Sequence, residues 1–286
     1  MRRTKRVLAA LRTIGATSVR WAEVRAIVFG AAVTLCCTGW LVLLARDISR
    51  EIEAARVQET SVYGFDGYFQ GSIPSSRSDK RLRYQLYVPP HFQTEKGPFP
   101  LIVFMPGYGE RHGSMDIGLA PAIRRQVKRD GRFDFVVFFA MDPEGCWQRG
   151  SEAAWQLKEM LDSVILRHRI DPCRVYLTGH SGGGCAVWNL AAEFPDMWAA
   201  LAPVVAGCNP EVEAIKGIPC WVFQGAKDSA EYVKGARKAV RDLRDAGTQV
   251  EYTEYPKDAH IIWQRVYYSD KLFKWFAEQK KPAQQR

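Results

Sequence analysis

Residues 174–193 read RVYLTGHSGGGCAVWNLAAE, and this stretch decides the fold that we expect. A short apolar run, RVYLT, leads directly into Gly179-His180-Ser181-Gly182-Gly183, and a helical spacing of apolar residues follows. A serine between glycines at a strand-to-helix junction is typical of a nucleophile elbow, where the hydroxyl stands exposed at the end of a sheet. The glycines leave room for the strained turn, and the helix that follows supplies unpaired N–H groups. An ordinary glycine-rich loop is the alternative interpretation.

A serine hydroxyl needs a general base, and a single histidine, His260, follows the motif in the chain. With an elbow of this kind the residues come in the order serine, acid, histidine, so His260 is the candidate base. The orienting acid should lie between them, after a strand, and Asp228 follows the expected strand CWVFQG. Asp258 is a rival that would have to fold back on its own loop, and Asp196 and Asp242 lie in or near expected helices.

Two N–H donors are needed to stabilise a developing oxyanion. One is expected from Gly182, the residue after the serine. The other is expected from the loop PGYGE at 106–110, where we choose Tyr108 and keep Gly109 as the alternative. For substrate contact we choose Trp147, Glu110 and Trp263, with core packing as the alternative for the two tryptophans.

Short apolar runs alternate with helical patterns after residue 80, which predicts an α/β fold. Several of these runs are apolar on both faces, as central strands of a mostly parallel sheet with helices on both faces should be. We expect this domain to span 80–279, preceded by a stalk or linker at 46–79 and followed by a disordered tail at 280–286. The expected strands lie at 84–88, 101–105, 133–140, 174–178, 201–205, 220–223 and 250–255, and the expected helices at 151–169, 230–246 and 262–278.

The segment at 26–45, AIVFGAAVTLCCTGWLVLLA, holds twenty residues without a charge. As a helix it would be about 30 Å long, which matches the hydrocarbon core of a bilayer. The basic segment 1–25 before it carries more Lys and Arg than the residues after it, so the N-terminus should stay in the cytoplasm. We therefore expect a single-pass membrane protein with its folded domain on the non-cytoplasmic side. A cleaved signal peptide and a buried helix are the alternatives.

The net charge of +9 comes from the two ends of the chain. Residues 1–25 hold seven basic side chains against one acidic, and residues 271–286 hold five against one. A nucleic-acid-binding domain needs a basic face on its folded part, so the charge argues against nucleic acid as a partner. A content of 47% hydrophobic and 25% charged residues is typical of a globular protein and excludes general disorder.

The seven cysteines do not form a disulfide framework, because two lie in the apolar run and five remain at irregular spacing. A single Cys208–Cys220 bridge is possible in an exported domain, although free buried cysteines are slightly favoured. No CxxC and no HExxH motif occurs, so the sequence predicts neither a metal nor a cofactor.

Three further segments accompany the motif: LYVPP…PLIVFMPGYGERHG before it, then FQGAKD and VEYTEYPKDAHIIW after it. Together they resemble the predicted peptidases of the prolyl oligopeptidase-like group of α/β-hydrolases, which are similar to polyhydroxybutyrate depolymerases and feruloyl esterases. The resemblance covers roughly 80–278 and implies an α/β-hydrolase fold with Ser181, Asp228 and His260 as a catalytic triad. It implies a serine hydrolase acting on small-molecule or polymeric esters, or on peptides. Because the chain departs from the family at positions such as Pro106 and Ala259, an inactive hydrolase-fold binding module is the alternative.

Overall fold

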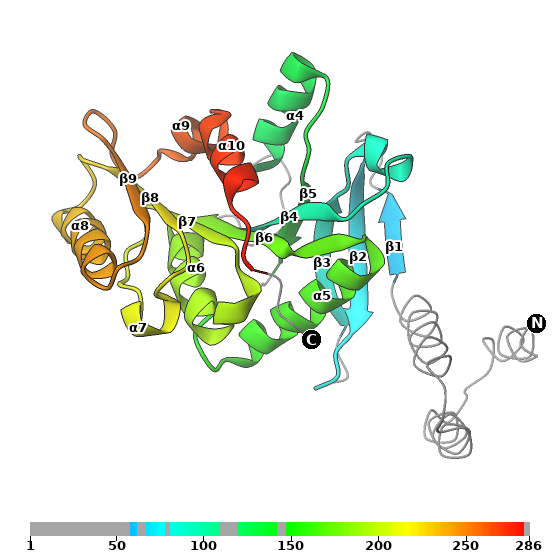
Figure 1. Ribbon diagram of the computed structural model, residues 1–286, viewed down its shortest axis with the longest axis horizontal. Helices are drawn as coiled ribbons and strands as arrows, with labels where there is room; N and C mark the ends of the chain where they lie inside the picture. Colours follow the sequence, from blue (N-terminus) through cyan, green and yellow to red (C-terminus); the bar gives the residue numbers. More distant parts are fainter. Residues whose placement is uncertain (1–57, 62–66, 78–80, 109–118, 142–146, 283–286) are drawn as a thin grey trace, which may run out of the picture. The chain divides into compact units, whose positions relative to one another are not determined.

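The computed structural model describes residues 58–61, 67–77, 81–108, 119–141 and 147–282, and Figure 1 shows their arrangement. A nine-stranded sheet runs through this part of the chain in the order β1-β2-β3-β5-β4-β6-β7-β8-β9. The six strands β4 to β9 pair in parallel, whereas β1, β2 and β3 add an antiparallel edge next to β5. The bounds are β1 (Gln58–Ser61), β2 (Tyr68–Pro74), β3 (Arg81–Tyr87), β4 (Phe99–Met105), β5 (Val136–Ala140), β6 (Ile170–His180), β7 (Ala200–Val204), β8 (Cys220–Gly225) and β9 (Val250–Tyr255).

Helices cover both faces of the sheet, as the alternating pattern of the sequence predicts. In Figure 1, α4, α9 and α10 lie on one side of the sheet, and α5 and α6 lie on the other. The helices are α4 (Leu119–Asp130), α5 (Glu152–Arg167), α6 (Gly182–Glu193), α7 (Val212–Ile215), α8 (Ala230–Asp245), α9 (Trp263–Tyr267) and α10 (Lys271–Glu278), with 3-10 turns η1 (Pro90–Gln93) and η3 (Pro195–Met197).

The central strand β4 shows how its sequence is buried on both faces. Leu101 and Val103 belong to the hydrophobic core that includes α5, α6 and α8, whereas Ile102 and Phe104 belong to the core that includes α4, α9 and α10. Successive side chains of a strand point to opposite faces, so the run LIVFM contributes to both cores at once. This explains why the strand reads as continuous apolar sequence rather than as an alternating pattern.

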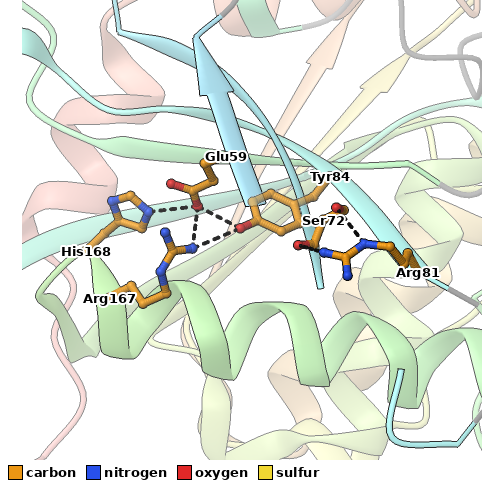
Figure 2. A network of polar contacts seen from close by, with 6 residues as sticks. All are labelled: Glu59, Ser72, Arg81, Tyr84, Arg167 and His168. Atoms are coloured by element: carbon orange, nitrogen blue, oxygen red, sulfur yellow. Dashed lines mark hydrogen bonds and ion pairs between the residues drawn. The ribbon is translucent and has the colours of Figure 1, made fainter. Parts of the chain in front are cut away.

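The stalk that we expected at 46–79 is wrong for its second half, because β1 and β2 lie in this segment and extend the sheet. Figure 2 shows how β1 is held by the carboxylate of Glu59. This carboxylate accepts hydrogen bonds from Tyr84 (2.7 Å) and Arg167 (2.8 Å) and lies 3.1 Å from Nε2 of His168. Arg81 of β3 also donates to the backbone carbonyl and side chain of Ser72 in β2. The edge strand β1 reads QETS, so apolar patterning does not reveal it.

The charge of Glu59 is stabilised although its side chain is only 12% exposed. Burial by itself would raise the pKa of this carboxyl, but the hydrogen bond and charge of His168, the Tyr84 hydroxyl and the Arg167 guanidinium lower the pKa to about 2. The ionised carboxylate therefore connects β1 to β3 and to the C-terminal end of α5.

The tail from 280 is not wholly free, because the backbone N–H of Lys281 donates to the carbonyl of Cys173 at 3.1 Å. No helix in the described part of the chain is long and apolar enough to cross a membrane. The expected basic segment 1–25 and the expected membrane span 26–45 lie outside the described residues.

Candidate active site

Ser181 lies between β6 and α6 in the strained turn that the motif predicts. Its φ of 58° and ψ of −116° are unusual for a residue with a side chain. The turn is pinned by the Ser181 N–H, which donates to the carbonyl of Val204 at 2.9 Å. A Cβ on Gly179 would lie 2.5 Å from the Gly183 oxygen, and one on Gly183 would lie 2.0 Å from the Met105 oxygen. Both flanking positions therefore have no room for a side chain.

His260 and Asp228 meet Ser181 at the carboxyl ends of the parallel strands. Nε2 of His260 lies 2.8 Å from Oγ of Ser181, and Nδ1 of His260 lies 2.8 Å from Oδ2 of Asp228. Because a carboxylate only accepts hydrogen bonds, Nδ1 carries the proton and Nε2 is left to accept the serine hydroxyl proton. The arrangement can therefore polarise the hydroxyl toward nucleophilic attack.

Asp228 is held by more than the histidine. Its carboxylate also accepts from Nε2 of Gln224 at 3.0 Å and from the backbone N–H of Ser229 at 2.8 Å. The side chain is only 7% exposed, whereas that of His260 is 33% exposed. The rival Asp258 instead faces Arg265 at 3.4 Å. The structure thus separates the two candidate acids by their partners.

His180, the variable residue of the motif, is part of the same arrangement and was missed as a site residue from the sequence. Its Nε2 lies 3.2 Å from the backbone oxygen of His260. Burial lowers the pKa of His180 to about 4, so its ring is neutral near pH 7 and can donate this hydrogen bond. The signal that could have revealed it is a polar residue at the end of a central strand that is otherwise apolar.

A pocket of about 190 Å³ opens beside the serine. Tyr108 and Gly182 are neighbours in its wall, because a Cβ on Gly182 would lie only 2.6 Å from the Tyr108 ring. Trp147 is 4% exposed and also lines this pocket. The lining residues are Pro106, Tyr108, Trp147, Gln148, Gly182, Cys185, Ala186, Asn189 and Cys208.

Trp263, one of the expected substrate contacts, does not line this pocket. Trp263 packs on the core that includes α4, α9 and α10, where its ring meets that of Tyr268 edge to face at 5.7 Å. Trp263 is the first residue of α9, and its role in substrate contact stays a prediction. Glu110 lies outside the described residues.

The cysteines of the described residues are free, and they are Cys173, Cys185, Cys208 and Cys220. The possible Cys208–Cys220 bridge is absent, because Cys220 is fully buried in β8 and its thiol donates to the Ile218 carbonyl at 3.2 Å. Cys208 instead faces Cys185 in the pocket wall. No group of three or more His, Cys, Asp or Glu within the described ranges could hold a metal ion.

The order of the strands, the turn at the serine and the helices on both faces define an α/β-hydrolase fold. Comparison with solved structures agrees: a thermostable esterase is 26% identical, with 76% of this chain and 64% of that chain covered and a TM-score of 0.63. An S-formylglutathione hydrolase from Agrobacterium tumefaciens is 19% identical, with 78% and 99% covered and a TM-score of 0.55. These similarities confirm the resemblance to α/β-hydrolases that the sequence shows.

A sequence relative points in the same direction. A poly(3-hydroxyalkanoate) depolymerase C from Paucimonas lemoignei is 42% identical over 59 residues, which is 21% of this chain and 14% of the depolymerase. The chain therefore spans less than two thirds of the depolymerase and of the thermostable esterase. No family model matches the chain.

Proposed function

We propose that the protein is a serine hydrolase that cleaves carboxylic esters through an acyl-enzyme. The observation that carries the proposal is the pair of 2.8 Å contacts that join Asp228, His260 and Ser181 beside a pocket. The similarity to esterases and to a depolymerase supports the same class of reaction.

The chemistry follows from the positions of the three side chains. Ser181 attacks the ester carbonyl while His260 takes its proton, and His260 then protonates the leaving alcohol. Asp228 holds the imidazole in the required tautomer and stabilises its positive charge. The N–H groups of Gly182 and Tyr108 are the proposed oxyanion donors, and losing one such donor typically costs about 3–4 kcal/mol of transition-state stabilisation. Water, activated by His260, then attacks the acyl-enzyme and releases the carboxylic acid.

The size of the pocket favours a small acyl group. An apolar cavity of about 150 Å³ holds a benzene molecule, so a pocket of about 190 Å³ suits a short aliphatic acyl chain or a single aromatic ring. Esters also have better leaving groups than amides, and therefore we place esterase activity ahead of peptidase activity. The substrate can be a small molecule or the chain end of a polyester.

A fluorophosphonate probe and p-nitrophenyl acetate test the proposal. The wild-type protein should take one label at Ser181 and hydrolyse the ester, whereas Ser181→Ala and His260→Ala should lose both activities. His91→Ala is a matched control, since His91 lies in η1 and contacts Asp134 rather than the serine. A folded wild-type protein that takes no label would indicate an inactive binding module instead. If the wild-type protein is active, a comparison of short-chain esters, feruloyl esters and peptide amides as substrates would define its preference.

We also propose that residues 26–45 anchor the protein in a membrane, with the hydrolase domain on the non-cytoplasmic side. The support is the uncharged apolar run and the greater number of basic residues before it. Two fusions at Arg286 test this topology. A phosphatase that is active only in the periplasm should be active when fused there, and a green fluorescent protein that is fluorescent only in the cytoplasm should be dark. A bright fluorescent fusion with an inactive phosphatase would contradict this topology.

A further inference from the structure

Two cysteines lie in the wall of the pocket beside Ser181, and the proposed ester reaction uses neither of them. Cys185 lies in the first turn of α6, one turn after the serine, and its N–H donates to the Ser181 carbonyl at 3.1 Å. Cys208 lies in the loop that follows β7. Both side chains are partly exposed, so small reagents that enter the pocket can reach them.

The packing of α6 against the end of β7 brings these thiols together. A Cβ on Gly184 would lie 2.8 Å from the Val204 oxygen and 3.1 Å from Cβ of Ala206. The first turn of α6 therefore packs tightly on the end of β7 and the start of the loop, and both cysteines line the same pocket. A Cβ on Gly207 would lie 2.5 Å from the Tyr232 ring of α8, so α8 also packs closely on this loop.

The two thiols differ in their readiness to react. The hydrogen bond from Cys208 lowers the pKa of Cys185 to about 7, with help from the backbone N–H groups of Gly207 and Cys208 and against the effect of burial. The same hydrogen bond and burial raise the pKa of Cys208. Cys185 is thus the more acidic of the two thiols and the better attacking group near neutral pH, whereas Cys208 stays protonated. Cys220 offers no such reactivity, because complete burial raises the pKa of its thiol.

We propose that Cys185 and Cys208 form a second reactive site, a dithiol that exchanges with small-molecule disulfides and closes to an intramolecular disulfide. The Cys185 thiolate attacks one sulfur of the small disulfide, and the other sulfur leaves as a thiolate that takes a proton. Cys208 then gives up its proton and attacks Sγ of Cys185, which expels the second small thiol. Two protein thiols are oxidised, and one small disulfide is reduced to two thiols.

Closing this bond alters the pocket in which Ser181 lies. A disulfide brings the two sulfur atoms to about 2.05 Å and removes the thiolate from the pocket wall. It also ties the loop after β7 to the first turn of α6, which is the turn that follows the serine. This effect on the pocket, unlike the disulfide itself, rests on the proposed ester hydrolysis.

The first experiment follows the disulfide itself by mass. Full-length protein is incubated with glutathione disulfide or with dithiothreitol, alkylated, and digested without reduction. We expect a linked peptide pair that contains Cys185 and Cys208, and an oxidised protein that melts about 5–10 °C higher. The Cys208→Ser protein should instead retain a glutathione adduct on Cys185. Cys173 lies outside the pocket, so the Cys173→Ser protein should form the Cys185–Cys208 disulfide as the wild type does. Alkylation of both pocket cysteines after oxidation, or a bond from either to Cys146, would overturn the proposal.

The second experiment measures the pocket. The KM for p-nitrophenyl butyrate should differ at least threefold between oxidised and reduced protein, and Cys185→Ala should show no difference. Equal KM values in a protein that carries the disulfide would refute the effect on the pocket. Absence of turnover and of fluorophosphonate labelling in both states would refute the ester hydrolysis, whereas the mass and melting results would still decide the dithiol.

Discussion

Gly225→Ala is expected to separate the histidine from the serine without touching either side chain. Gly225 ends β8, and the segment that leads into His260 lies directly against its Cα. An added Cβ would lie 1.9 Å from the backbone oxygen of Ala259 and 2.7 Å from that of Asp258. The N–H of Lys227 donates to the Asp258 oxygen at 2.9 Å, so this segment is held against β8 from a second point.

The size of the effect follows from these distances. Real Cβ atoms essentially never approach other atoms within 3.0 Å, so the segment must move by about 1.1 Å, the difference from the 1.9 Å contact. A shift of this size breaks the 2.8 Å contact between His260 and Ser181. Misplacing a catalytic group by about 1 Å costs roughly 100-fold in rate. We therefore expect kcat for p-nitrophenyl acetate to fall about 100-fold, with a loss of stability of about 1–3 kcal/mol from overpacking.

The assay compares kcat, KM and the melting temperature of Gly225→Ala with those of a matched glycine variant. Gly235 lies in α8, and a Cβ there would have its nearest neighbour, Oδ1 of Asn209, at 3.8 Å. Gly235→Ala should therefore keep its activity and gain up to about 1 kcal/mol from better helix propensity. A folded Gly225→Ala protein with kcat within threefold of the wild type would refute the reasoning.

Four other substitutions test the remaining parts of the structure. Asp228→Asn should fold normally but lose roughly 10³–10⁴-fold in kcat, because an amide favours the wrong imidazole tautomer; Asp258→Asn should stay within threefold, and a drop at Asp258 instead would reassign the acid. Glu59→Gln should lower the free energy of unfolding by about 1–3 kcal/mol at pH 7. Since the Glu59 pKa is about 2 when folded and 4.5 otherwise, urea unfolding should show this difference at pH 7 and lose it as the pH falls from about 4.5 to 2. The His180 pKa falls from 6.5 to about 4 on folding. As the pH falls from 6.5 to 4, the wild type should therefore lose up to about 3 kcal/mol of stability that His180→Gln does not lose. Parallel pH profiles of the two proteins in urea unfolding would contradict this.

The sequence was most informative where the chain is buried. The strands from β4 to β8 were predictable because both of their faces lie under helices, so their side chains are apolar almost without interruption. The expected helix at 151–169 also forms as α5, and Ser151 caps its N-terminus with a hydroxyl oxygen that accepts from the N–H of Ala154 at 3.2 Å. In these places the residue pattern along the chain reflects the burial and capping that the fold provides.

The sequence was less informative where partners are distant or the surface is polar. The strand β1 reads QETS, and the hydrogen bonds of Glu59 to residues far along the chain hold it in place. The pairing of Cys208 with Cys185 depends on how closely α6 approaches β7, which no spacing in the chain reveals. The expected helix at 262–278 is divided into α9 and α10, and Trp263 packs on the core that includes these two helices.

The antiparallel edge of the sheet has a practical consequence for immobilising the enzyme on a support. In the strand order, β1 is the first strand and β6, which ends directly before Ser181, is the sixth. Neighbouring strands lie about 4.8 Å apart, so roughly 24 Å of sheet separates the two. A resin coupled through a linker just ahead of β1 would therefore hold the protein by the edge remote from Ser181 and leave the mouth of the pocket open to the solution.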